Sequence, residues 1–165
     1  MWLGDIAYAT RHGVSGLYLA FWLDRCSRKI GGCDVRNTIS EDLLSKALRR
    51  ALAGRRPPAW LIVHSDQGSQ STATRLKRML AHNGAMSSMS QRGNRYDKAH
   101  AEWFWSRIKA ELPDGGSLPG LTEAKLGIRH HLAKYNARCQ HSALGHQTFN
   151  LFETSLQITP QLCAA

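Results

Sequence analysis

The spacing of apolar and polar residues changes along the chain, and these changes divide it into predicted elements. The first third reads as strands at 2-WLGDIAYA-9 and 17-LYLAFWLD-24, joined by a turn at 13-GVSG-16. Because the second run has no polar alternation, we expect a strand that is covered on both faces. After a turn at 25-RCSR-28, a third strand is expected at 29-KIGGCDV-35, which completes an antiparallel meander.

The pattern then switches to helical spacing. Thr38, followed three residues later by Glu41, has the form of a capping box. Leucine and alanine recur at helical intervals between 43 and 52, so we expect a helix to run to about Arg55, where Pro57 and Pro58 stop it.

Strands and helices alternate in the rest of the chain, which predicts a mixed sheet with helices packed against it. A helix after residue 98 carries an apolar stripe that must face the core, formed by Ala101, Phe104, Trp105, Ile108 and Leu112. The other expected elements are a strand at 60–64, a helix at 72–83 that ends at Gly84, a strand at 85–89, and a helix at 122–136 followed by a polar tail.

Composition fits one folded domain with a basic surface. The chain has 165 residues, 42% of them hydrophobic, and 22 lysines and arginines against 12 acids give a net charge of +10. This charge favours a polyanionic partner such as nucleic acid. No apolar run approaches the length of a membrane span and no secretion signal opens the chain, so a cytosolic protein is expected.

The four cysteines do not suggest a metal site. Cys26, Cys33, Cys139 and Cys163 form no CxxC pair and no zinc-like spacing with histidine, so free and mostly buried thiols are expected. A zinc protein is therefore the weakest of the alternatives.

Three of the few acidic residues stand beside apolar neighbours. Asp5 interrupts the first strand, Asp66 follows the strand at 60–64, and Glu102 lies beside the apolar stripe of a helix. A buried carboxylate is costly unless it is paired or binds a metal. Each one alone can equally be a turn, cap or surface residue, and only the combination points to a cation site. Asp24 competes for membership, although pairing with an arginine is at least as good an interpretation.

Carboxylates without a cysteine or histidine cluster suit a hard ion such as Mg²⁺ or Mn²⁺. In a basic chain, the substrate that fits such a site is a phosphodiester. Two ions roughly 3.5 to 4 Å apart would activate an attacking oxygen and stabilise the leaving one.

Several ordered motifs resemble one known family. The stretches 2-WLGDIAY-8, 17-LYLAFWLDRCSRKIGG-32, 64-HSDQGSQ-70, 88-SMSQRGNRYDKAHAEWFWSRIKAE-111 and 135-YNARCQHSALG-145 look like the catalytic domain of DDE transposases from the insertion-sequence family numbered three, relatives of retroviral integrase. Asp66 and Glu102 are separated by 35 residues, which is the spacing of the family signature.

The resemblance implies an α/β, RNase H-like fold: a five-stranded mixed sheet, its first three strands antiparallel, flanked by helices. It implies a catalytic core at 1–153 with a tail at 154–165. Asp5, Asp66 and Glu102 match the triad that holds two divalent ions for cleavage of transposon ends and joining to target DNA. It also implies DNA and a homo-oligomer as partners, with an upstream helix-turn-helix region or partner.

Basic residues within the same motifs are candidate DNA contacts. Lys98 and Lys109 share the helix face of Glu102, although both can be ordinary solvated lysines. Arg92, Arg95 and His141 lie in the stretches that carry the resemblance. Trp103 remains open between packing and base stacking, and His64 between a role beside Asp66 and a satisfied strand-end histidine.

The chain departs from the family pattern at four positions. Lys98 replaces an asparagine, Ser71 a tyrosine, Cys139 an arginine, and Phe149 a proline. Loss of the guanidinium at Cys139 weakens the expected DNA binding of this segment. The alternatives are a truncated, inactive remnant that binds nucleic acid or oligomerises, and a ribonuclease H or junction nuclease, against which the 35-residue spacing argues.

Overall fold

The protein is described here by a computed structural model. The model describes residues 1–11, 14–40, 42–65, 70–89, 103–104, 106–108 and 120–158.

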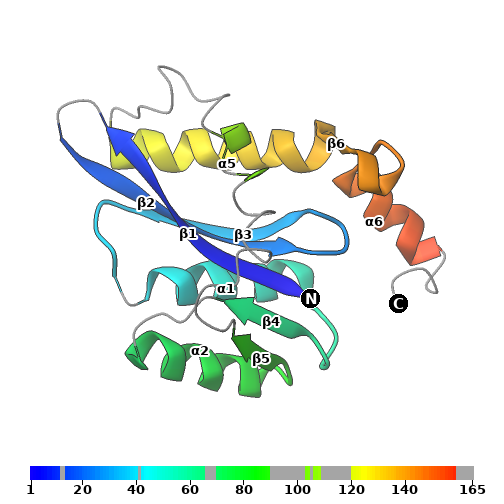
Figure 1. Cartoon of the computed structure of the whole chain (residues 1–165), viewed down its shortest axis with the longest axis horizontal. Coiled ribbons are helices and arrows are strands. Elements are labelled where there is room, and N and C mark those ends of the chain that lie inside the picture. Colours follow the sequence, from blue (N-terminus) through cyan, green and yellow to red (C-terminus); the bar gives the residue numbers. More distant parts are fainter. Residues whose placement is uncertain are drawn as a thin grey trace.

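A five-stranded mixed sheet forms the centre of the molecule, in the order β3-β2-β1-β4-β5 (Figure 1). β1, β2 and β3 are antiparallel, whereas β4 and β5 run parallel to β1. This confirms the predicted sheet and meander. The strands are β1 (Trp2–Arg11), β2 (Val14–Asp24), β3 (Ile30–Arg36), β4 (Ile62–Ser65) and β5 (Met86–Met89).

Helices cover both faces of this sheet. In Figure 1, α5 lies on one side of the sheet, and α1 and α2 lie on the other. Residues 103–104 and 106–108 are also helical. The longer helices are α1 (Leu43–Arg55), α2 (Gln70–His82), α5 (Leu121–Arg138) and α6 (Phe149–Ile158). None of the helices in the described ranges is both long and apolar enough to cross a membrane.

Side chains of the central strands alternate between the two faces of the sheet, so the core has two parts. Trp2, Trp22 and Val63 pack with α1 and α2, whereas Leu3 and Phe21 pack with Phe104, α5 and α6. This explains why the run at 17–24 has no polar alternation: both faces of β2 are buried, as predicted.

Two local predictions are wrong. Val14 to Gly16 belong to β2, so the expected turn at 13–16 does not exist as such. Thr38 does not cap α1, because the N-cap is Asp42 and it makes no side-chain cap bond. Ser40 and Lys46 instead hydrogen-bond and pair with the Asp42 carboxylate, and the N–H of Leu43 donates to the carbonyl of Ser40. Glu41, the other half of the expected box, lies outside the described residues.

The expected polar tail after residue 136 is also wrong. α5 continues to Arg138, and it is followed by β6 (Gln140–His141), a 3₁₀ turn η1 (Ser142–Leu144), β7 (Gln147–Thr148) and α6. Phe149 anchors α6 in the core with no exposed surface. The division at residue 153 stays a prediction, and α6 crosses that position.

Two of the four cysteines follow the expectation of free thiols. Cys33 and Cys139 are free and partly buried, and burial raises the pKa of Cys33 to about 11. The expectation is wrong for Cys26, which is disulfide-bonded. Its partner lies outside the part of the chain described by the structure.

Candidate active site

Asp5 lies half-buried near the middle of β1. Leu3 and Ala7, two residues away on either side, belong to the core under α5. Residues two apart on a strand point to the same face, so the Asp5 side chain is on that face of the sheet. In the register with β2, Asp5 stands opposite Phe21, and the Phe21 ring meets the Phe104 ring edge-on at 4.6 Å. Oδ1 of Asp5 accepts a hydrogen bond from the N–H of Ile6 at 2.9 Å.

β4 ends beside Gly4, the residue before Asp5. In the parallel pairing of β1 with β4, Leu3 stands beside His64 and Gly4 beside Ser65. Asp66 follows directly in the sequence but lies outside the described residues. The position of Asp66 in the site therefore remains a prediction.

His64 has the environment of a strand-end core histidine. Its side chain is 8% exposed, and Nδ1 lies 3.1 Å from the hydroxyl of Ser88 on the neighbouring strand β5. Of the two interpretations left open by the sequence, this contact favours packing and hydrogen bonding.

Phe104 and Ile108 pack against the same face of the sheet as Asp5. Phe104 and Ile108 are fully buried, as the apolar stripe predicts. Trp103 is 38% exposed, and its ring lies edge-on to the ring of His141 at 5.3 Å. Glu102, which precedes Trp103, and Trp105 lie outside the described part of the chain.

Of the predicted DNA contacts, His141 lies in the described part of the chain. Its Nδ1 accepts a hydrogen bond from the N–H of Ala143 at 3.1 Å and so caps η1. Burial, and to a smaller extent the charge of Arg28, lower the pKa of His141. A neutral imidazole with Nδ1 engaged has only its other nitrogen to offer to a phosphate. Lys98, Lys109, Arg92 and Arg95 fall outside the described residues.

Asp24 is excluded from a cation site by its partners. Its carboxylate accepts hydrogen bonds from Trp2 Nε1 and from the N–H of Cys26, and Oδ2 pairs with Arg55 at 3.0 Å. This confirms the arginine-pairing interpretation. Among the described residues, no group of three histidines, cysteines or acids could hold a metal.

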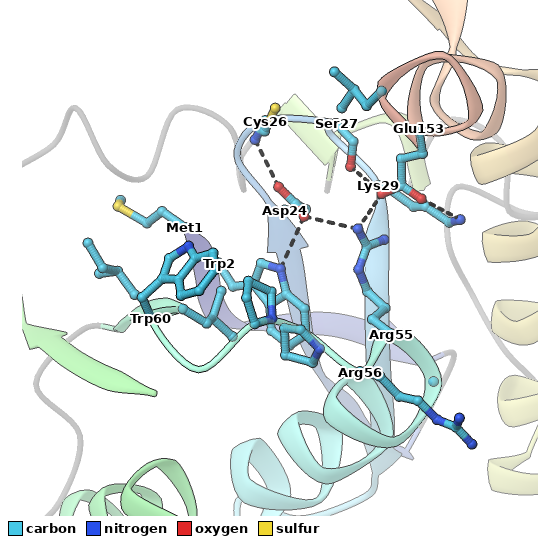
Figure 2. Close-up of a pocket in the computed structure, with 16 residues that line it drawn as sticks. Met1, Trp2, Asp24, Cys26, Ser27, Lys29, Arg55, Arg56, Trp60 and Glu153 are labelled. Atoms are coloured by element: carbon cyan, nitrogen blue, oxygen red, sulfur yellow. Dashed lines mark hydrogen bonds and ion pairs between the residues drawn. The ribbon is translucent and has the colours of Figure 1, made fainter. Parts of the chain in front are cut away.

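A cavity lies at the other end of the central strands, beside Met1, Trp2 and Ile62 (Figure 2). Its volume is about 670 Å³. Asp24, Arg55 and Glu153 converge on its wall, where Arg55 pairs with both acids and Lys29 pairs with Glu153 at 2.8 Å. These pairs tie the end of β2 to α1 and α6, so we interpret the cluster as structural.

No sequence motif predicts this cluster. Arg55 and Glu153 are 98 residues apart, and no local spacing relates them. Only the docking of α6 brings them together.

Comparison with protein families identifies the chain's relatives. The model of the family described as "Integrase core domain" matches residues 1–95. The transposase for insertion sequence element IS904 of Lactococcus lactis is 37% identical over 155 residues, covering 93% of this chain and 60% of that protein. Transposase InsF for insertion sequence IS3A of Escherichia coli is 31% identical over 153 residues, covering 92% and 53%. The chain thus spans little more than half the length of these relatives.

Solved structures share the fold at low sequence identity. A simian T-cell lymphotropic virus intasome in complex with a phosphatase regulatory subunit matches with a TM-score of 0.68 and 14% identity, over 98% of this chain and 55% of that one. The HTLV-2 integrase catalytic core with magnesium, in its dimeric form, matches with a TM-score of 0.64 and 15% identity, over 90% and 91%. These matches and the observed sheet confirm the RNase H-like architecture. From its match to the family model over more than half of its residues, the chain belongs to the integrase core domain family.

Proposed function

We propose that this chain is the catalytic core of a transposase that cleaves transposon ends and joins them to target DNA, with Asp5, Asp66 and Glu102 as its metal-binding carboxylates. The observation that carries the proposal is the pairing of Gly4 with Ser65. Asp5 follows Gly4 on β1 and Asp66 follows Ser65 in the sequence, so each is one peptide unit from a paired position.

Strand geometry supports an approach of the two aspartates. Adjacent strands lie about 4.8 Å apart, and consecutive Cα atoms about 3.8 Å. Leu3 and His64 stand side by side, so alternation continued by two residues puts both aspartates on one face.

The packing of residues 103–108 supports the third carboxylate. Glu102 directly precedes this segment in the sequence, and Phe104 within the segment touches Phe21, which stands opposite Asp5. A carboxylate from this segment is therefore expected on the face that carries Asp5.

The donor set fits Mg²⁺ or Mn²⁺, because hard ions with several remaining waters bind through a few carboxylates. Two such ions would supply activation of the attacking oxygen and stabilisation of the leaving oxygen in an in-line displacement. The three carboxylates hold the charge that these ions need. We further propose that Lys98, Lys109, Arg92, Arg95 and His141 orient the DNA backbone at the site, and that the protein acts as an oligomer in the bacterial cytosol.

Cleavage of DNA by the purified protein tests this proposal. The substrate is labelled duplex DNA from the flanks of the gene, with Mn²⁺ supplied. We expect metal-dependent nicking that falls by at least about 10³-fold in Asp5→Asn, Asp66→Asn and Glu102→Gln, since each removes charge needed at the metal site.

Glu123→Gln is the matched control, because it removes one exposed carboxylate that is not part of the proposed triad, and losing this negative charge from α5 should not reduce nicking. Equal nicking in Asp5→Asn and wild type would overturn the assignment. DNA binding without any nicking, even when an upstream DNA-binding region is supplied, would instead support the alternative of an inactive remnant.

A further inference from the structure

The outer face of α5 carries a concentration of positive charge that the catalytic carboxylates do not use. The inner face packs on the sheet through Ala124, Ile128, His131, Leu132 and Tyr135. The helix contains Lys125, Arg129, Lys134 and Arg138, all exposed, against a single acid, Glu123.

The cations straddle a low ridge. At about 100° per residue, Ala133 and Ala137 project opposite the buried face, together with Leu126, His130 and Glu123. Lys125 and Arg129 then lie on one flank of this ridge, and Lys134 and Arg138 on the other. Small alanine side chains allow close approach of a partner, and long cationic side chains reach around it from both sides.

Three of these cations have no competing partner. Within the described part of the chain, Lys125, Arg129 and Arg138 form neither an ion pair nor a hydrogen bond through their side chains. Elsewhere the protein does pair its cations, as Arg50 does with Asp34 at 2.7 Å. The charges of these three residues are therefore available for an external anion.

The same helix of a second copy does not fit this face. A two-fold contact through α5 would set the same cations against each other, which is unfavourable without intervening anions. A membrane does not fit either, because Leu126, 62% exposed, is the single large apolar side chain on the ridge.

Duplex DNA matches both the charge and the size of the face. From Lys125 to Arg138 the helix rises about 20 Å at 1.5 Å per residue, which corresponds to about six base pairs at 3.4 Å each. The helix is about 10–12 Å across with its side chains, close to the roughly 12 Å width of a major groove.

We propose that the outer face of α5 binds the phosphate backbone of duplex DNA, as a contact separate from the carboxylate site. The inference rests on the proposed function, since it takes DNA as the substrate.

The position of α5 connects this contact to the site. Asn136 hydrogen-bonds the backbone of Ile30 on the edge strand β3, so its flank of α5 faces that strand. Lys134 and Arg138 lie on the other flank of α5 and face away from β3. Arg107 Nη2 lies 3.9 Å from Cys139 Sγ, so residues 103–108 meet the C-terminal end of α5. DNA held near Glu102 can therefore continue over α5.

Salt dependence of DNA binding tests the inference. The Kd of the purified protein for a 30-base-pair duplex without metal is measured as a function of salt for wild type and for K125Q/R129Q/R138Q. Each lost phosphate contact makes the slope of log K against log salt shallower by about 0.9. We expect a slope shallower by about 2 to 3 and a Kd at least tenfold weaker at 0.1 M salt.

The matched control is R49Q/R56Q/K77Q, which removes the same charge from exposed positions at α1 and α2 on the other face of the sheet. It should change the slope by less than about 1. Equal changes in the two triple variants, or an unchanged slope in the α5 variant, overturn the inference.

Chemical labelling of the unmodified protein gives a second measurement. Bound DNA should slow acetylation of Lys125 at least fivefold while leaving Lys77 unaffected, and equal rates at Lys125 with and without DNA overturn the inference. If the wild type binds DNA but the α5 variant is unaffected, only this contact fails. If the wild type binds no DNA, the proposed function fails with it.

Discussion

At the scale of single residues, the position next to Asp5 is as constrained as Asp5 itself. A Cβ on Gly4 would lie 2.4 to 2.7 Å from three ring atoms of Trp22. Trp22 is fully buried, and its Nε1 donates to the carbonyl of Leu44 at 3.1 Å. The ring therefore cannot move aside without losing this hydrogen bond or disturbing the packing of α1.

We accordingly expect Gly4→Ala to lower the free energy of unfolding by about 1–3 kcal/mol, as overpacked cores do. Urea denaturation measures the change. Gly54→Ala is the control, since nothing lies within 4 Å of a Cβ there and an alanine in a helix gains about 0.5–1 kcal/mol over glycine. Equal stability of Gly4→Ala and wild type would contradict the close contact.

Glu153 gives a residue-scale prediction with a pH dependence. Burial raises the pKa of Glu153, but hydrogen bonds from Lys29, Ser27 and Arg55 outweigh it, so the pKa is lowered. A lowered carboxyl pKa contributes stability that is complete above the ordinary range of a glutamate and is lost as the pH falls through the lowered value.

Glu153→Gln should therefore lower the free energy of unfolding by about 2 kcal/mol at pH 7, because the charged Lys29 and Arg55 lose their carboxylate acceptor. Its difference from wild type should shrink as the pH falls from 5 toward 3. Thermal unfolding across this pH range measures both, with Glu123→Gln as a surface control. A difference that stays constant over the range would show that the charge of Glu153 is not what stabilises α6.

At the scale of elements, α1 and β3 meet through a glycine. A Cβ on Gly32 would lie 2.5 Å from the carbonyl oxygen of Ala47 and from the backbone nitrogen of Ala51, and backbone cannot rotate away as a side chain can. At Gly31, the residue before it on the strand, the nearest atom belongs to a side chain and not to the backbone, the Cδ of Arg55 at 2.7 Å. A Cβ at Gly32 would therefore collide with the backbone of α1, whereas a Cβ at Gly31 would first collide with a side chain of α1.

We expect Gly32→Ala to destabilise the protein by about 3 kcal/mol, because α1 must move as a unit, and Gly31→Ala to cost less than about 1 kcal/mol. Chemical denaturation of the two variants side by side measures the contrast. Similar losses in both would mean that β3 rather than α1 takes up the strain.

Elements with a long apolar pattern were predictable from the sequence, and those that depend on contacts distant in sequence were not. The run at 17–24 predicts β2 because a nearly continuous apolar sequence is typical of a strand that is buried on both faces. Thr38 and Glu41 match a capping motif, yet the Ser40–Asp42–Lys46 contacts start α1 later. α6 is short, and its docking depends on Phe149 and on the pair of Glu153 with Arg55, neither of which has a periodic signal.

At the scale of the whole molecule, the candidate site joins three parts of the chain, and the sequence could name its members better than their geometry. A lone aspartate in an apolar strand indicates Asp5, and the family spacing indicates Asp66 and Glu102. That Asp5 faces Phe21 and Phe104, on the side opposite α1 and α2, follows only from the register and the two cores. Residue type alone does not separate Asp24 from the site carboxylates. Its ion pair with Arg55, which forms only in the folded protein, excludes it from the site.

The proposed metal site, with ligands from three separated segments, predicts a stability linkage that does not depend on catalysis. Ion binding to the folded state alone stabilises it by RT ln(1 + [L]/Kd), or about 1.4 kcal/mol at ten times Kd. For a domain of this size that corresponds to a rise in Tm of about 3–6 °C. Thermal unfolding with increasing Mn²⁺ should show this rise in wild type and in Glu123→Gln.

Asp5→Asn should lose the rise in Tm with Mn²⁺, because one of the three charges that hold the ions is gone. Without metal, Asp5→Asn should be as stable as wild type or more so, since it relieves repulsion among carboxylates. An equal Mn²⁺ shift in Asp5→Asn and wild type would place the ion elsewhere. A loss of stability without metal would mean instead that the contacts of Asp5 within the sheet dominate its role.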